Sequence, residues 1–147
     1  MARYSIGGIA SAAATATLPA VTLAAAAASG LRLREVGIFN TTATSFYVSL
    51  RRFSTAGTRG AGVTVVPHDP NSPAAAATGA DANTSTAPTL VGGTQRIAVL
   101  PAAIGGGVIW TFGDTGLALL AGTGLMYGIL CPSGTGQVFT YYMDFDE

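Results

Sequence analysis

Charged residues are scarce in this chain. Its 147 residues include seven basic and seven acidic side chains, 10% of the total, and the net charge is zero. Soluble domains usually carry about 25% charged residues. A free monomer so poor in charge exposes apolar surface and tends to associate. The composition therefore favours a subunit of an assembly, in which neighbouring chains cover part of the surface.

Lysine is missing and cysteine occurs once. All seven basic residues are arginines, which we attribute to a GC-rich genome because the chain is also rich in Ala, Gly and Thr. The chain has no basic excess of the kind that attracts nucleic acid, so no nucleic-acid partner is predicted. With Cys131 alone, no disulfide can form within the chain.

Long apolar runs are absent as well. No stretch reaches the roughly 18 uninterrupted apolar residues of a transmembrane helix, so no membrane partner is predicted. Residues Ile6–Ala28 loosely resemble a secretory signal, but Gly, Ser and Thr interrupt the stretch throughout. We expect a soluble, uncleaved chain.

Residues that carry catalysis are sparse. A metal site needs several converging His, Cys or carboxylate ligands, whereas His68 and Cys131 are single and far apart in sequence. No G-x-S-x-G elbow and no complete phosphate-binding glycine motif occurs. We therefore expect no enzyme, with no catalytic, cofactor-binding or metal-binding residue and no cofactor.

Alternating apolar residues predict strands. Leu31–Asn40 has a phase change that indicates a bulge near residues 35–37, and a turn at Thr41–Thr44 predicts a hairpin with Ser45–Phe53. Glycine-rich turns separate five further apolar runs, namely Arg96–Leu100, Val108–Phe112, Leu117–Leu120, Gly124–Cys131 and Gln137–Phe145. We expect about eight to ten strands in one all-β domain over residues 1–147, an antiparallel β-sandwich of jelly-roll type.

Three segments point to neighbouring subunits. The strand Leu125–Cys131 is apolar on both faces, so we expect the opposite sheet to cover one face and another subunit the other. Residues 1–16 are predicted to be an extended arm. Residues 67–94, rich in Pro, Ala and Thr, are predicted to be one long ordered loop, which at about 90 Å fully extended reaches well beyond its own domain.

A candidate interface follows from these segments and from exposed charges. The arginines on strands are expected either to form salt bridges with Asp or Glu of neighbouring subunits or to lie on solvated strand faces. The complete set is Arg3, Tyr4, Arg32, Arg34, Arg51, Arg52, Pro67, His68, Asp69, Pro73, Pro88, Leu125, Met126, Asp144 and Asp146.

Four stretches together resemble a known class of proteins: GLRLREVGIFNTTAT, RRFSTAGTRGAG, GVIWTFGDTGLALLAGTG and GTGQVF, at 30–44, 51–62, 107–124 and 134–139. They resemble small virion structural proteins of tailed phages that infect high-GC actinobacteria, namely head decoration (cement) proteins or other virion components built on β-sandwich domains. The resemblance implies a homo-oligomer, with a trimer favoured. It also implies a place on the outer surface of the capsid and the major capsid protein as partner.

Two other functions fit the same sequence. A glycan-binding jelly-roll module of a tail fibre or adhesin predicts exposed aromatic side chains, for which Tyr47, Tyr142 and Trp110 are the candidates, although Trp110 with Phe112 is more typical of core packing. A self-assembling tail-tube subunit predicts that the arm and the loop link identical copies.

Overall fold

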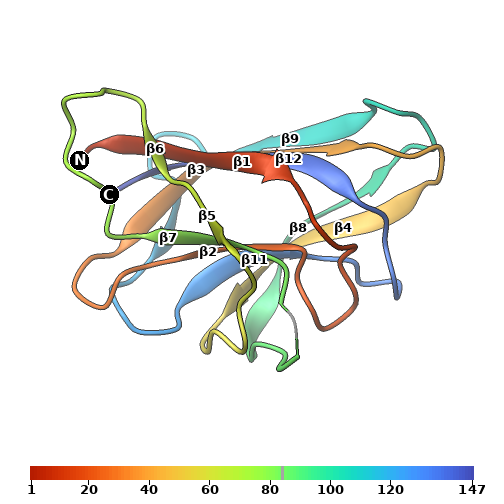
Figure 1. The fold of residues 1–147 in the computed structure, drawn as a ribbon, viewed down its shortest axis with the longest axis horizontal. Helices are drawn as coiled ribbons and strands as arrows, with labels where there is room; N and C mark the ends of the chain where they lie inside the picture. The colour runs from red at the N-terminus through yellow and green to blue at the C-terminus, as the bar shows by residue number, and fades with distance from the viewer. Residues whose placement is uncertain (84) are drawn as a thin grey trace.

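The chain forms two antiparallel β-sheets. The computed structural model describes residues 1–83 and 85–147, and this part of the chain contains twelve strands and no helix. The strands are β1 (Arg3–Ile9), β2 (Val21–Ala24), β3 (Leu31–Asn40), β4 (Phe46–Phe53), β5 (Gly62–Val63), β6 (Val66–Pro67), β7 (Thr78–Asp81), β8 (Leu90–Leu100), β9 (Gly107–Thr111), β10 (Leu117–Leu119), β11 (Met126–Leu130) and β12 (Phe139–Asp146). Figure 1 shows the two sheets stacked face to face. The all-β prediction is confirmed.

The strand pairing is nested. One six-stranded sheet, sheet A, has the order β10-β3-β12-β1-β6, with β9 pairing β3 beside β10; the other, sheet B, has the order β5-β7-β2-β11-β4-β8. The first four strands pair with the later ones in reverse order: β1 with β12, β2 with β11, β3 with β10 and β9, and β4 with β8. The short strands between them extend the sheets, since β6 pairs β1 and β7 pairs β2.

The core lies between the sheets. On β12 every second residue points inward, as the sequence pattern predicts, and the largest inward side chains of both sheets are fully buried. Each buried Leu, Ile, Val or Phe contributes about 1.5–3 kcal/mol relative to an exposed one. The inward set includes Ile6, Val21, Leu23, Leu33, Val36, Ile38, Val48, Leu50, Tyr127, Ile129, Phe139, Met143 and Phe145.

The bulge in β3 lies at Arg34. Asp144 pairs with Glu35 and Phe145 pairs with Leu33, which leaves Arg34 as the extra residue. It falls one residue before the predicted range of 35–37. The inserted residue lets the apolar phase change along β3, and it turns the Arg34 side chain toward β12.

Two local predictions are wrong. No hairpin forms across Thr41–Thr44, because β3 and β4 lie in different sheets; Asn40 Nδ2 donates to the Thr44 carbonyl at 2.7 Å and holds this crossing. Within residues 1–16, predicted as an arm, Arg3–Ile9 form β1, which pairs along its whole length with β12 and also with β6. Tyr4 and Ile6 bury their side chains in the core, and this burial stabilises the strand within its own chain.

Residues 67–94 do not form one extended loop. Thr78–Asp81 is β7, in the interior of sheet B, and β8 begins at Leu90; Thr84 lies outside the described residues. The Glu147 carboxylate accepts hydrogen bonds from the backbone N–H groups of Ala76 and Ala77, at 2.9 and 3.1 Å. These contacts fasten the segment to its own domain.

Strand β11 is buried on both faces, as predicted, but the chain itself covers the second face. Met126 and Leu130 pack with Phe53 and Ala24 in a small apolar cluster on the outside of sheet B. Ala56, from the loop after β4, packs against this cluster. The predicted covering subunit is therefore not needed here.

Candidate functional site: interaction surfaces

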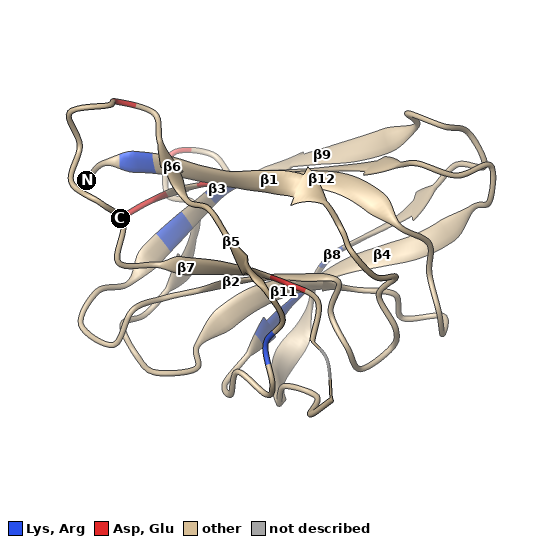
Figure 2. Ribbon diagram, in the orientation of Figure 1, with Lys and Arg blue, Asp and Glu red and all other residues tan. Residues whose placement is uncertain are grey.

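Five of the predicted interface residues meet on the outer face of sheet A. The buried carboxylate of Asp146 accepts from Arg3 Nε at 2.9 Å and from Arg34 Nε at 2.6 Å. His68 Nε2 lies 3.7 Å from Asp144 Oδ1. We call these five residues the terminal charge cluster. Figure 2 shows several charged segments around the end of the molecule that carries both termini, while the opposite end is tan.

The two aspartates of this cluster have opposite pKa shifts. Burial alone would raise the pKa of Asp146, but hydrogen bonds and charges from Arg3 and Arg34 outweigh it, and the pKa is lowered. Burial raises the pKa of Asp144, and the neighbouring Glu35 adds to this effect while His68 and Arg3 oppose it. The ion pairs of Asp146 are thus satisfied within the chain.

Other predicted interface residues also make contacts within the chain. Tyr4 donates its hydroxyl proton to the Pro73 carbonyl at 2.9 Å, and Pro67 pairs with Tyr4 across β1 and β6. Asp69 accepts from the Asn71 backbone N–H at 2.9 Å. Pro88 and Met126 are buried.

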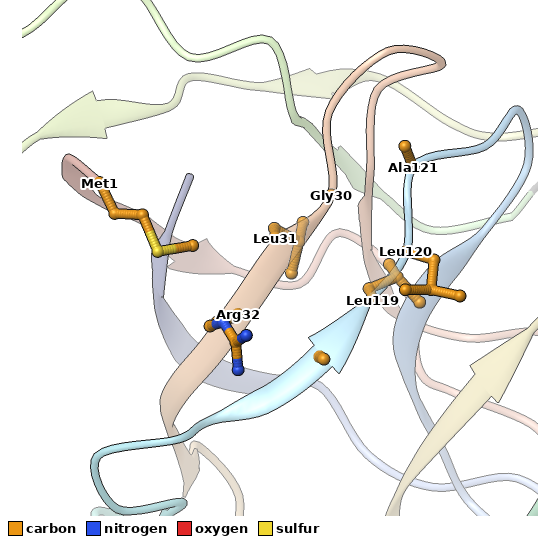
Figure 3. A pocket seen from close by; sticks show the side chains of 8 residues that line it. Met1, Gly30, Leu31, Arg32, Leu119, Leu120 and Ala121 are labelled. Carbon is orange, nitrogen blue, oxygen red and sulfur yellow. The ribbon is translucent and has the colours of Figure 1, made fainter.

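Three predicted residues, Arg32, Arg52 and Leu125, line two neighbouring hollows. Arg32 lines a hollow of about 280 Å³ together with Met1 and Leu31 (Figure 3). Arg52 and Leu125 line a second hollow of about 230 Å³.

Leu119 and Leu120 line both hollows. Leu120 is 75% exposed, and Met1 is also exposed. We call this surface the Leu120 end patch; it consists of Met1, Leu31, Arg32, Arg52, Leu119, Leu120 and Leu125.

The charges of the Leu120 end patch have one sign. Among the described residues that line the two hollows, none is acidic, and the two charged ones are Arg32 and Arg52. Arg32 donates to the Thr115 carbonyl at 2.9 Å, and this neutral acceptor does not balance the positive charge of the guanidinium. Beneath the patch, Tyr127 donates to the Ala118 carbonyl at 2.9 Å and links the two sheets. Burial raises the pKa of Tyr127, so this hydroxyl stays protonated at neutral pH.

A second exposed apolar surface lies on β8, the last strand of sheet B. Ile97 and Val99 are 56% and 53% exposed, and Tyr47 of β4, paired with Val99, lies on the same face. The sequence predicts the strand Arg96–Leu100, but this surface is not among the predicted interface residues. The signal was present, because the strand alternates and carries a single charged residue.

The aromatic candidates for glycan stacking have different environments. Trp110 is buried. Tyr142 lies over Gly37 and donates to Glu35 Oε1 at 2.6 Å, and burial together with this bond raises its pKa to about 12. Tyr47 alone of the three is exposed.

Neither a metal site, a membrane-spanning helix nor a known relative points to a function within the described residues. Within residues 1–83 and 85–147 no three His, Cys, Asp or Glu side chains gather closely enough to hold a metal ion. Over the same residues, no helix has the length and apolar character to cross a membrane. The chain matches no protein-family model, no curated protein and no solved structure.

Proposed function

We propose that this chain is a virion structural protein, a capsid decoration or cement subunit that binds the outer surface of a phage head through the Leu120 end patch. The sequence resemblance supports the choice of assembly. The observation that carries the docking proposal is Leu120, an exposed leucine set between two apolar hollows with an arginine at each.

The jelly-roll assignment belongs to the same proposal. A jelly roll arises when a long antiparallel ribbon wraps into two sheets. In this ribbon the first strand pairs with the last, the second with the second-to-last, and so on inward. The pairs β1–β12, β2–β11, β3–β10/β9 and β4–β8 follow this scheme. Strands β5 to β7 are then an insertion at the closed end of the ribbon. Jelly rolls are common among viral capsid domains.

The patch chemistry defines the partner surface. An exposed leucine beside two hollows fits an apolar surface that has both a recess and a protruding side chain. Arginine is enriched in binding hot spots and pairs bidentately with carboxylates. The capsid surface bound by this patch is therefore apolar at its centre, with Asp or Glu placed opposite Arg32 and Arg52.

The test is binding to phage heads that lack this protein. Leu120→Asp and the double variant Arg32→Glu/Arg52→Glu are expected to weaken co-sedimentation with the heads at least tenfold and to abolish protection of the heads against heat. The matched control is Ile104→Asp, because Ile104 is 76% exposed but lies in the loop between β8 and β9, away from the patch. Circular dichroism verifies that each variant is folded.

Two outcomes overturn the proposal. If the wild-type chain neither binds heads nor changes their heat stability, the decoration role is wrong. If the wild-type chain binds heads but Leu120→Asp binds as well as Ile104→Asp does, another surface is used.

The glycan-binding alternative has less support from side-chain positions. Of its three aromatic candidates, Trp110 is in the core and the Tyr142 hydroxyl is bonded to Glu35. A single exposed Tyr47 is a small platform for a sugar. Binding of the purified chain to a glycan array would revive this alternative.

A further inference from the structure

We propose that a second copy of this chain pairs with residues Gln95–Leu100 of β8, edge to edge and antiparallel about a twofold axis. We call this segment the β8 edge. The pairing is independent of the Leu120 end patch, which lies partly on sheet A, and of any capsid partner.

The outer edge of β8 is open. Its inner edge pairs regularly with β4, from Phe46 opposite Leu100 to Leu50 opposite Arg96, and no strand follows β8 in the sheet. Among the described residues, no backbone hydrogen bond outside the strand ladders involves residues 96–100. An exposed edge strand presents N–H and C=O groups ready to pair with another strand.

Within residues 95–100 the open edge has only one of the usual protective features, an inward-pointing charge at Arg96. Natural edge strands carry lysines, inward-pointing charges, prolines or bulges that prevent pairing. Residues 95–100 contain one charge, Arg96, whose guanidinium carbon lies over the Phe112 ring at 5.1 Å from its centre. The segment is bounded on one side by the register shift opposite Arg51 and on the other side by Pro101. Neither feature interrupts it.

The side chains favour a register centred on Ala98. In that register Ile97 of each copy is opposite Val99 of the other, on the outer face beside Tyr47. Cross-strand pairs of β-branched residues contribute about 0.2–1 kcal/mol each. Arg96 is then opposite Leu100, and the two Arg96 positions lie about 13 Å apart along the strands, so like charges do not face each other.

The reciprocal match of Ile97 with Val99 favours a second copy as the occupant, and the other edge of sheet B favours a closed dimer over head-to-tail pairing. Strand β5, at that edge, has only two residues, so head-to-tail pairing of β8 with β5 offers a much shorter ladder. A twofold β8–β8 contact uses the same surface on both chains and closes. Because the net charge is zero, net electrostatic repulsion does not oppose the association of two copies.

Sedimentation equilibrium of the purified chain tests the pairing. Wild type is expected to be a concentration-dependent dimer, and Ile97→Lys/Val99→Lys is expected to raise the dimer dissociation constant at least tenfold. The matched control is Ile109→Lys, because Ile109 is 52% exposed and lies on β9, an edge strand of the other sheet. A wild-type monomer or trimer, filaments, or equal loss of dimer in both variants overturns the proposal.

Cysteine scanning tests the register. Ala98→Cys is expected to give a covalent dimer on mild oxidation, because Ala98 faces its own mate across the axis at a Cα distance that a disulfide spans, about 4.4–6.8 Å. Arg96→Cys is the control and is expected to stay largely uncrosslinked at about 13 Å. Native Cys131 is buried and does not compete. Preferential crosslinking of the Arg96→Cys variant overturns the register.

Discussion

The terminal charge cluster of sheet A and the β8 edge of sheet B use their side chains in opposite ways. In the cluster, Asp146 joins β12 to Arg3 of β1 and Arg34 of β3. On the β8 edge, one charge lies over an aromatic ring and Ile97 and Val99 face outward. A chain with seven acidic side chains uses several of them to hold itself together. The two surfaces described for partners, the Leu120 end patch and the β8 edge, are mainly apolar, and their charged residues are arginines.

The largest expected effect is at the centre of the cluster. Asp146→Ala leaves two guanidiniums without their carboxylate, and we expect the free energy of unfolding to fall by about 2–3 kcal/mol. Urea unfolding measures it. The control Asp114→Ala, at an exposed loop position, is expected to change stability by less than about 0.5 kcal/mol. Equal effects of the two variants would show that the cluster does not join the strands.

A smaller effect is expected at Gly37, on the same sheet face. A Cβ atom there would lie 2.1 Å from Tyr142 Cε1, so Gly37→Ala displaces the ring from its hydrogen bond with Glu35. We expect a loss of about 1–2 kcal/mol. Gly93→Ala, where a Cβ meets nothing within 4 Å, is the control. In a Tyr142→Ala background the Gly37→Ala cost should largely disappear, and a cost that persists there would contradict this explanation.

Acid should weaken the cluster in a defined range. The pKa of Asp146 is lowered in the folded chain, so its contribution is complete above the unfolded pKa of about 3.9 and is lost as the pH falls through the lower folded value. The raised pKa of Asp144 has the opposite sign and partly offsets this loss. We expect urea midpoints to fall below about pH 4 more steeply in wild type than in Asp146→Asn. Parallel curves would rule out the Asp146 contribution.

The smallest effect on folding is expected at the β8 edge. Ile97→Lys replaces a side chain that is more than half exposed, so the unfolding free energy of the dilute chain should change by less than about 0.5 kcal/mol. Thermal unfolding at low and high protein concentration checks this. A loss above about 1 kcal/mol in dilute protein would mean that Ile97 packs within its own chain.

Alternation made much of the fold predictable from the sequence. Leu31–Asn40 has the bounds of β3, and the predicted run Gln137–Phe145 covers most of β12, whose inward residues follow a period of two. The partners of these strands were not predictable, because a local pattern gives which face is buried and not which strand lies alongside. This is why a hairpin was expected at Thr41–Thr44 where the chain in fact crosses between sheets.

The charged residues illustrate the same limit. Arg3 is predicted as an interface residue within the arm, Arg34 as an arginine on a strand and Asp146 as a charge near the end of the last strand. Their mutual contact depends on β1 and β3 flanking β12, a long-range arrangement that no local window contains. Leu120 was part of a predicted strand, but only the end of β10 at Leu119 shows that its side chain is left in solvent.

The nested strand pairing also has a consequence for the order of folding. Arg3 and Asp146 lie 143 positions apart in sequence, yet they sit in neighbouring strands. Contacts so distant along the chain slow folding, because loop closure comes before any gain from pairing. During synthesis, the edge of β1 that pairs with β12 stays open until β12 has left the ribosome. The pairing of β1 with β12 therefore forms late, and a chain that still lacks β12 exposes an unpaired edge of β1.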